Sequence, residues 1–430
     1  HRDDTGRQRM RMIPGSLVRS FWTLADQGVV SLGMFAINIQ LARTFPSQEY
    51  GTFVFFLSVL LALQVVNVSL IQYPLSVDGT VLDPARRRTL AGSAVLLTAG
   101  SLLPLSGLLA LVGYGLGMPE MIGPTVLYFI VWQVQEIGRR GLMAGLKHDQ
   151  ALWGDSLTYL GQVVVLNLMA LGGHLTLERV FVAMTGPALA GAVVHFAILR
   201  PGFGGLSDLP AVCRRFWSIG HWALANNLFL MLRVQSLVWL MAAMDGMAST
   251  AAFQAVVNLV NIANPIIIGM GNLVPQVAAR GRSALSDDGG APHPDEKAWL
   301  AIRGYVVIGA APLLVYYSLA LLIPDQVLHI VYGTASPYAN QELPLRLLSI
   351  GALTGYLAEM VCSYFYGVQR SQFALVVNVV GTLAVFAAVG PLAAMYGVAG
   401  VCMALLFSSV LRVGAAQYYL SKTRTAHVAR

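Results

Sequence analysis

The 430-residue chain is strongly apolar, since 56% of its residues are hydrophobic and only 11% are charged. Soluble domains carry about 25% charged residues, and a chain with so few charges would expose large apolar patches to water, which excludes an ordinary soluble protein. We assign the net charge of +7 to loops that orient the chain in a membrane rather than to nucleic-acid binding. The three cysteines form no CxxC pair, so neither a disulfide framework nor a thiolate metal site is indicated.

Apolar stretches between charged or Pro/Gly-rich breaks predict an all-α polytopic membrane protein with about twelve transmembrane helices. The predicted spans cover residues 18–42, 50–72, 90–114, 122–138, 152–172, 179–199, 216–241, 249–274, 299–323, 343–366, 373–394 and 398–419. Residues 327–332 are expected to form a short interfacial helix or to extend the preceding span. Residues 283–290 are rich in Ser, Asp and Gly and are expected to form a flexible loop. Prolines at Pro74, Pro265 and Pro275 predict kinks.

Basic residues collect in alternate gaps between the predicted spans. Arg86–Arg88, Arg139 with Arg140, and Arg214 with Arg215 all fall in gaps of one parity, whereas the other gaps hold little beyond Arg43. Because cytoplasmic loops are enriched in Lys and Arg, this asymmetry predicts that both termini are cytoplasmic.

The two halves of the chain resemble each other. Residues 20–26 read SFWTLAD and residues 215–221 read RFWSIGH, while Glu136 and Glu359 stand at nearly matching positions. These matches occur in the same order, which predicts an internal repeat. We therefore expect two pseudo-symmetric six-helix lobes in parallel orientation, a known transporter plan with the substrate between the halves. The predicted divisions are a cytoplasmic segment 1–17, an N-lobe 18–199, a cytoplasmic linker 200–215, a C-lobe 216–420 and a cytoplasmic tail 421–430.

The segment 41–53, LARTFPSQEYGTF, resembles the LAR-hLGPxEYGxF segment of Wzx-like oligosaccharide flippases of the polysaccharide transport family, although Phe-Pro-Ser replaces the usual Leu-Gly-Pro. Segments 136–150 and 396–401 also resemble that family. The resemblance implies the multidrug/oligosaccharidyl-lipid/polysaccharide (MOP) exporter fold, which is MATE-like, with a cavity lined mainly by the first, second, seventh and eighth spans. It implies a polyprenyl-pyrophosphate-linked oligosaccharide as substrate, flipped to the outer leaflet of a bacterial inner membrane, with membrane lipids and polysaccharide export machinery as partners and with no cofactor.

Two ionisable residues near the inner ends of spans are candidates for ion coupling. Asp26 lies about two turns into the first predicted span, and the repeat places His221 at the matching depth of the seventh. Such residues are costly inside a membrane and are therefore functional candidates. Because histidine titrates near neutral pH, an Asp26–His221 pair could carry a proton. The alternative is that both side chains lie close enough to the inner face to contact water or headgroups.

Arginines supply the candidate anion-binding residues. Arg233 lies past the middle of the seventh span, where its guanidinium should face a cavity or a partner. The planar fork of arginine suits phosphate, so we expect it to contact pyrophosphate or an acidic sugar, with structural pairing or snorkelling as the alternative. Arg139 and Arg140 are expected to form an ion-pair network with Glu136 and Asp155. Their alternative role is to receive the pyrophosphate headgroup at the inner mouth.

Amide side chains form stripes on predicted spans. In a membrane such stripes can bridge helices or contact sugar hydroxyls, and both interpretations remain open. The candidates are Gln64 and Asn67 in the second span, Asn226 and Asn227 in the seventh, and Gln254, Asn258, Asn261 and Asn264 in the eighth.

Two other functional classes compete with a flippase. A multidrug cation antiporter of the same fold would need an acid-lined cavity to bind cationic drugs. Arg233 and the basic net charge favour an anionic substrate instead. A membrane polymerase, ligase or glycosyltransferase would need catalytic groups on large outer loops or soluble domains, and the predicted gaps are too short for these. No GxxxxGK[ST] nucleotide loop is present, so ATP is not expected to drive transport directly.

Overall fold

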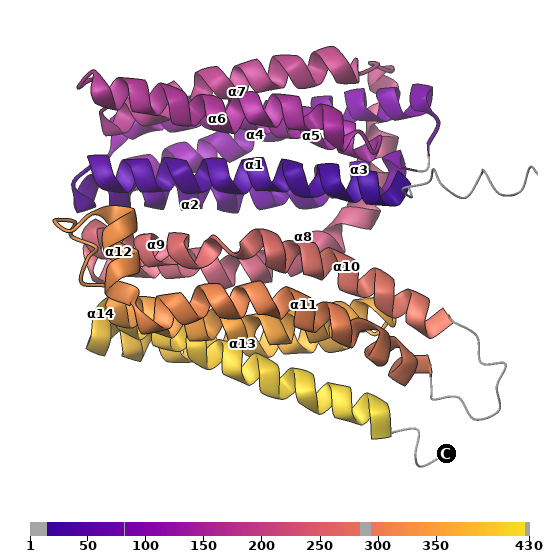
Figure 1. Ribbon diagram of the computed structural model, residues 1–430. Helices are drawn as coiled ribbons and strands as arrows, with labels where there is room; N and C mark the ends of the chain where they lie inside the picture. Colours follow the sequence, from indigo (N-terminus) through magenta and orange to yellow (C-terminus); the bar gives the residue numbers. More distant parts are fainter. Residues whose placement is uncertain (1–14, 81, 284–293, 426–430) are drawn as a thin grey trace, which may run out of the picture. The chain divides into compact units, whose positions relative to one another are not determined.

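The computed structural model describes residues 15–80, 82–283 and 294–425 (Figure 1). The regular structure in these ranges is helical throughout. Most of the expected flexible loop at 283–290, most of the segment 1–17 and part of the tail 421–430 lie outside the described residues. The helices are α1 Gly15–Thr44, α2 Ser47–Asn67, the π-helical turn Val68–Gln72, α3 Tyr73–Gly79, α4 Pro84–Gly115, α5 Ile122–Ala144, α6 His148–Leu171, α7 Leu177–Leu199, α8 Leu209–Met244, α9 Gly246–Asn261, α10 Asn264–Ser283, α11 Pro294–Leu322, α12 Pro324–Tyr332, α13 Glu342–Gly367 and α14 Ser371–Thr425.

Each predicted span coincides with a helix or a helix pair, which confirms the all-α membrane fold. In the described ranges seven helices are long and apolar enough to cross a membrane, and an eighth is counted if α9 and α10, which meet at 54°, form one broken span. The helices α1, α5 and α6 are not among them, and these three carry the buried charges described below. The short helix predicted near residues 327–332 is α12.

Breaks in the helices follow local sequence signals. Pro265 is the second residue of α10, at the bend that follows α9, as the predicted kink requires. At Gly397 the backbone adopts φ 55° and ψ −130°, a conformation that strongly favours glycine. It divides α14 between the eleventh and twelfth predicted spans. At the start of α4 the Asp83 carboxylate accepts hydrogen bonds from the backbone N–H groups of Ala85 and Arg86 and caps the helix.

The chain divides into two compact units. The first contains the described residues up to Ile37 and Val66–Leu224, and the second contains Asn38–Val65 and the described residues from Ala225 onward. The compact units therefore assign residues 38–65 to the second unit, whereas the predicted N-lobe includes them. The predicted lobes, which rest on the order of the spans, stay a prediction.

Small residues allow close packing in the first unit, where α5 and α6 both pack against α7. A Cβ atom at Gly141 would lie 2.6 Å from the Leu199 side chain, and one at Gly191 would lie 2.0 Å from the Thr158 hydroxyl. Such close approach of helices is typical of membrane proteins, where packing replaces the hydrophobic effect as the driving force.

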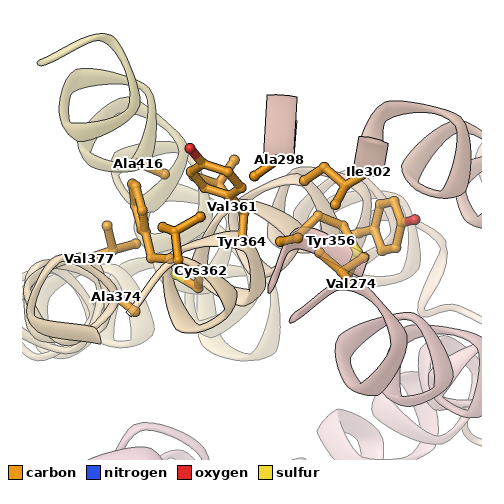
Figure 2. Close-up of a cluster of buried hydrophobic side chains, with 14 of the residues drawn as sticks. Val274, Ala298, Ile302, Tyr356, Val361, Cys362, Tyr364, Ala374, Val377 and Ala416 are labelled. Atoms are coloured by element: carbon orange, nitrogen blue, oxygen red, sulfur yellow. The ribbon is translucent and has the colours of Figure 1, made fainter. Parts of the chain in front are cut away.

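The core of the second unit joins α10, α11, α13 and α14 (Figure 2). Cys362 and Tyr364 of α13 are buried among apolar side chains of the neighbouring helices. The buried tyrosine hydroxyls find backbone partners, since Tyr356 donates to the Val306 carbonyl at 2.9 Å and Tyr364 donates to the Asp295 carbonyl at 2.9 Å. These bonds fix α13 against α11, and other residues of α13 line the cavity described next.

Candidate functional site

The second unit contains an open cavity of about 710 Å³. This volume lies within the range of pockets that hold small organic ligands, about 300–1,000 Å³. Its wall is mostly apolar, with charged and polar side chains from several helices. The polar lining residues are Ser58, Arg233, Gln235, Gln254, Asn261, Asn264, Asn272, Glu359, Ser363, Ser409 and Arg412.

The charges on this wall are predominantly basic. Its charged residues, among those described, are Arg233 of α8, Arg412 of α14 and Glu359 of α13. Nη2 of Arg412 donates to Oε2 of Glu359 at 3.0 Å and to Oδ1 of Asn378 at 2.9 Å. Nη1 of Arg233 is buried and has no hydrogen-bond partner among the described residues. A buried guanidinium donor without a partner is costly, so it is ready to receive an anionic ligand.

The amide stripe of the eighth predicted span has two roles. The Asn258 carboxamide donates to the Tyr50 hydroxyl at 2.9 Å and accepts from Gln254 at 2.7 Å, so this buried residue bridges α9 and α2. Asn261, Asn264 and Gln254 line the cavity instead. Asn258 therefore serves helix packing, whereas Asn261, Asn264 and Gln254 present amides to the cavity.

Three of the other predicted amides, Gln64, Asn67 and Asn226, are not among the described residues that line this wall. Gln64 and Asn226 are half-buried in the second unit and are not among the described residues that line the cavity. Asn67 belongs to the first unit, where its amide donates to Gln133 at 3.0 Å and its oxygen accepts from Ser101 at 2.7 Å. Asn67 thus holds its helix to α5 and α4, and its predicted contact with sugar has no support from these bonds.

Arg139 is the centre of a buried ion cluster in the first unit. Its Nε donates to Oδ2 of Asp155 at 2.5 Å, its Nη2 donates to Oδ2 of Asp26 at 2.7 Å, and its Nη1 lies 3.6 Å from Oε1 of Glu136. All four side chains are almost wholly buried. Arg140 is half-buried, with its Nε 3.8 Å from Oε2 of Glu136. Because the three nitrogens of Arg139 all face carboxylates, the cluster favours the ion-pair network over pyrophosphate binding at this residue.

Acidic groups outnumber basic ones in this cluster. Three buried carboxylates face the guanidinium groups of Arg139 and Arg140. Oδ1 of Asp26 is buried without a hydrogen-bond partner among the described residues. Because an unbalanced buried charge is expensive, one additional proton or positive charge would complete the cluster.

The structure does not bring the side chains of Asp26 and His221 together. Asp26 pairs with Arg139, whereas Nδ1 of His221 is bonded to the Trp217 carbonyl oxygen of its own helix at 2.8 Å. The His221 ring also stacks on Trp217 and lies beside Trp222. Asp26 and His221 stand at matching positions of the predicted repeat, but their side chains are not in contact.

His195 is a buried histidine that adjoins the ion cluster. Its Nε2 lies 2.9 Å from the Ala151 carbonyl oxygen and 3.7 Å from Oδ1 of Asp155. A Cβ atom at Gly154 would lie 2.2 Å from this same nitrogen, so only glycine leaves room for the ring. The imidazole is thereby fixed beside Asp155.

Two important residues escaped the sequence reasoning, namely Arg412 and His195. Arg412 is an ionisable residue within the twelfth predicted span, so the argument applied to Arg233 would have found it. His195 is four residues from the end of the sixth span, where contact with water is equally compatible with the sequence. Among the described residues no group of three or more His, Cys, Asp or Glu side chains is arranged to hold a metal ion.

Comparison with known proteins gives the fold. No protein-family model and no curated protein sequence matches the chain. Among solved structures, an inward-facing multidrug-resistance MATE family transporter of the MOP superfamily is similar, with a TM-score of 0.73 at 13% identity over 94% of this chain and 98% of that one. The lipid II flippase MurJ in an inward closed conformation gives 0.70 at 10% identity over 93% and 87%.

A third neighbour is a MOP superfamily transporter from Pyrococcus furiosus, described as having a binding pocket of reverse polarity. Its TM-score is 0.62 at 14% identity, over 96% of each chain. The similar structures are thus MOP superfamily transporters, and the chain shares their fold. This confirms the predicted fold class, whereas membership of the Wzx-like family stays a prediction.

Proposed function

We propose that the chain is a flippase for a polyprenyl-pyrophosphate-linked oligosaccharide, which it moves from the inner to the outer leaflet by alternating access. The observation that carries the proposal is the basic wall of the cavity in the second unit, where Arg233 and Arg412 stand against the single carboxylate Glu359. Guanidinium groups bind phosphate oxygens through paired hydrogen bonds. The amides Gln254, Asn261 and Asn264 on the same wall supply donors and acceptors for sugar hydroxyls.

The similarity to the lipid II flippase MurJ supports a lipid-linked substrate, because the same fold serves a protein of that description. The chain is proposed to lie in a bacterial inner membrane with both termini cytoplasmic, in accord with the distribution of its basic residues. Reporter fusions at the C-terminus test this orientation. A reporter active only in the cytoplasm should be active there, and activity of a reporter that requires export would contradict it.

The buried cluster of the first unit is proposed to couple transport to protons. Asp26, Asp155 and Glu136 outnumber their two arginine partners, so the cluster is balanced when it holds a proton. Asp26→Asn removes one charge with little change in volume. We expect this variant to bind substrate but to lose the response of transport to a pH gradient. Transport that responds to the gradient as in the unaltered protein would contradict the role of Asp26.

A multidrug cation antiporter is the second candidate, because MATE transporters share the fold. Glu359 is its one supporting feature, as the acidic group on the cavity wall. The two functions give different phenotypes on gene deletion. A flippase predicts that one lipid-linked glycan accumulates on the inner leaflet, whereas an antiporter predicts sensitivity to cationic drugs without such accumulation.

Arg233 provides the molecular test of the flippase in the deletion strain. Arg233→Lys keeps the charge but removes the planar fork, so a bidentate phosphate site should lose most of its activity and the glycan should still accumulate. Arg43→Lys is a matched control. Arg43 is exposed, donates to the Val331 and Ile330 carbonyl oxygens and is not among the described residues that line the cavity. Full complementation by Arg233→Lys would remove Arg233 from the substrate site.

A further inference from the structure

Arg412 occupies a site that is built around it in the second unit. Arg412 belongs to a membrane-spanning helix, and its charged side chain is only 7% exposed. A Cβ atom at Gly381 would lie 2.5 Å from its Cγ, so the glycine makes room for the arginine. The Ser408 hydroxyl donates to the Gly381 carbonyl at 2.7 Å and holds the two segments of α14 together at this point. The guanidinium is therefore directed to a fixed place on the cavity wall.

The partner of Arg412 is held much less firmly. The Glu359 side chain is 40% exposed and lies on the wall of the cavity, so it can turn away from the guanidinium without breaking the core. Arg412 would then keep its bond to Asn378, which is buried. A fixed cation with a movable carboxylate is the arrangement expected where one anion is exchanged for another.

The predicted internal repeat allows the surroundings of Arg412 to be compared with those of Arg139. The same spacing in the sequence separates Glu136 from Glu359, Arg139 from Cys362, and Asp155 from Asn378. In the first unit, Arg139 is held by three carboxylates. In the second unit, the positions that match Arg139 and Asp155 hold the neutral residues Cys362 and Asn378.

Glu359 is therefore the carboxylate that neutralises Arg412 among the described residues. While Glu359 is bonded to Arg412, Arg233 still has a buried Nη1 without a hydrogen-bond partner among the described residues. Once Glu359 has moved away, both guanidinium groups on the wall can receive an anion.

We propose that Glu359 is an internal counter-ion, which pairs with Arg412 while the cavity is empty. The diphosphate group of the substrate displaces Glu359 from this pair. Arg233 and Arg412 then together receive the negative charges of the diphosphate, and Glu359 turns into the cavity. When Glu359 returns to Arg412 it competes with the bound anion and promotes its release. The nature of the anion rests on the proposed function, whereas the competition between Glu359 and an anion rests on the geometry alone.

The test uses the full-length protein in lipid nanodiscs, with inorganic pyrophosphate as the probe and isothermal titration calorimetry as the measurement. Glu359→Gln removes the competing charge but retains the size of the side chain. We expect it to bind pyrophosphate about fivefold more tightly than the unaltered protein, since partly exposed ion pairs contribute up to about 1 kcal/mol. Glu359→Ala should change the affinity in the same direction. Glu342→Gln, which removes an exposed charge from the same helix α13, is the control and should leave the affinity unchanged.

Each outcome decides the matter. Equal or weaker binding by Glu359→Gln, or no binding by any variant, overturns the competition. Tighter binding by Glu359→Gln and by Glu342→Gln alike also overturns it, because the effect would then be one of overall charge. A separate flipping assay with a lipid-linked oligosaccharide keeps the two proposals apart. If Glu359→Gln binds pyrophosphate more tightly but the unaltered protein moves no lipid-linked sugar, the counter-ion stands and the proposed substrate falls.

Discussion

At the scale of single residues, the two units hold arginine in opposite ways. Arg139 is enclosed by Asp26, Asp155 and Glu136, and its charge is more than neutralised. Arg233 keeps a buried donor without a partner in the described part of the second unit. In a medium of low dielectric constant, the first arrangement is structural or proton-linked and the second invites an anion.

Replacement of Arg139 tests the structural role of the buried cluster. Arg139→Met would leave three buried carboxylates without their central partner, so we expect a loss of about 3–5 kcal/mol in the free energy of unfolding. Denaturant unfolding in detergent measures this loss. Arg86→Met is the control, because its side chain is 79% exposed and it should change stability by no more than about 0.5 kcal/mol. A stable Arg139→Met protein would show that the cluster is already neutral without the arginine.

Gly154→Ala tests the close contact with His195. The added methyl group would lie 2.2 Å from the imidazole Nε2, so α6 and α7 must separate or the ring must move. We expect destabilisation by about 1–3 kcal/mol, as for other overpacked cores. Gly186→Ala on α7 has no neighbour within 4 Å and should be neutral or slightly stabilising. Equal thermal stabilities for the two variants would argue against the contact.

The residue types in the spans predicted which side chains are exceptional but not their partners. Asp26 and Arg233 stand out in the sequence because charges are rare inside membrane helices. Their partners depend on which helices pack together, and for that reason the expected Asp26–His221 pair was wrong. The Asn258 carboxamide shows the same limit, since its bond to the Tyr50 hydroxyl joins residues far apart in the sequence.

At the scale of helices, each predicted span coincides with a helix or a helix pair, while several departures from regular helix follow proline and glycine. Pro265 marks the 54° bend between α9 and α10, and Gly397 divides α14. The π-helical turn Val68–Gln72 lies just before Pro74, where a kink was predicted, but the sequence did not predict its form. It depends on one extra residue in the hydrogen-bonding register, which hydropathy does not report.

Gly397→Ala tests the division of α14. A Cβ atom is strained at φ 55° and ψ −130°, so we expect a loss of about 1–3 kcal/mol in stability. Gly390→Ala, in the same helix and with no neighbour within 4 Å, should be tolerated. Thermal unfolding of the two purified variants gives the comparison. If alanine is accepted equally at both positions, the backbone at Gly397 is not required to be left-handed.

At the scale of the whole molecule, the predicted repeat matches positions that differ in charge. Glu136 and Glu359 stand at nearly matching positions, and at the same spacing Asp155 is matched by Asn378. The first unit consequently holds an acid-rich cluster and the second a base-rich cavity. Composition and hydropathy predicted an all-α membrane protein, and the resemblance of segment 41–53 to Wzx-like flippases implied the MOP fold. The assignment of acid-rich and base-rich sites required the contacts of Arg139 and Arg412.

The central claim is that the basic cavity moves an anionic lipid-linked sugar. Proteoliposomes that contain the purified protein and a fluorescent polyprenyl-diphosphate-linked oligosaccharide test it most directly, with a membrane-impermeant quencher reporting the leaflet. We expect the unaltered protein to equilibrate the label between leaflets and Arg233→Gln to slow this at least about tenfold, as the loss of a charged hydrogen bond implies. Equal rates for the two proteins, or flipping no faster than in protein-free liposomes, would contradict the account.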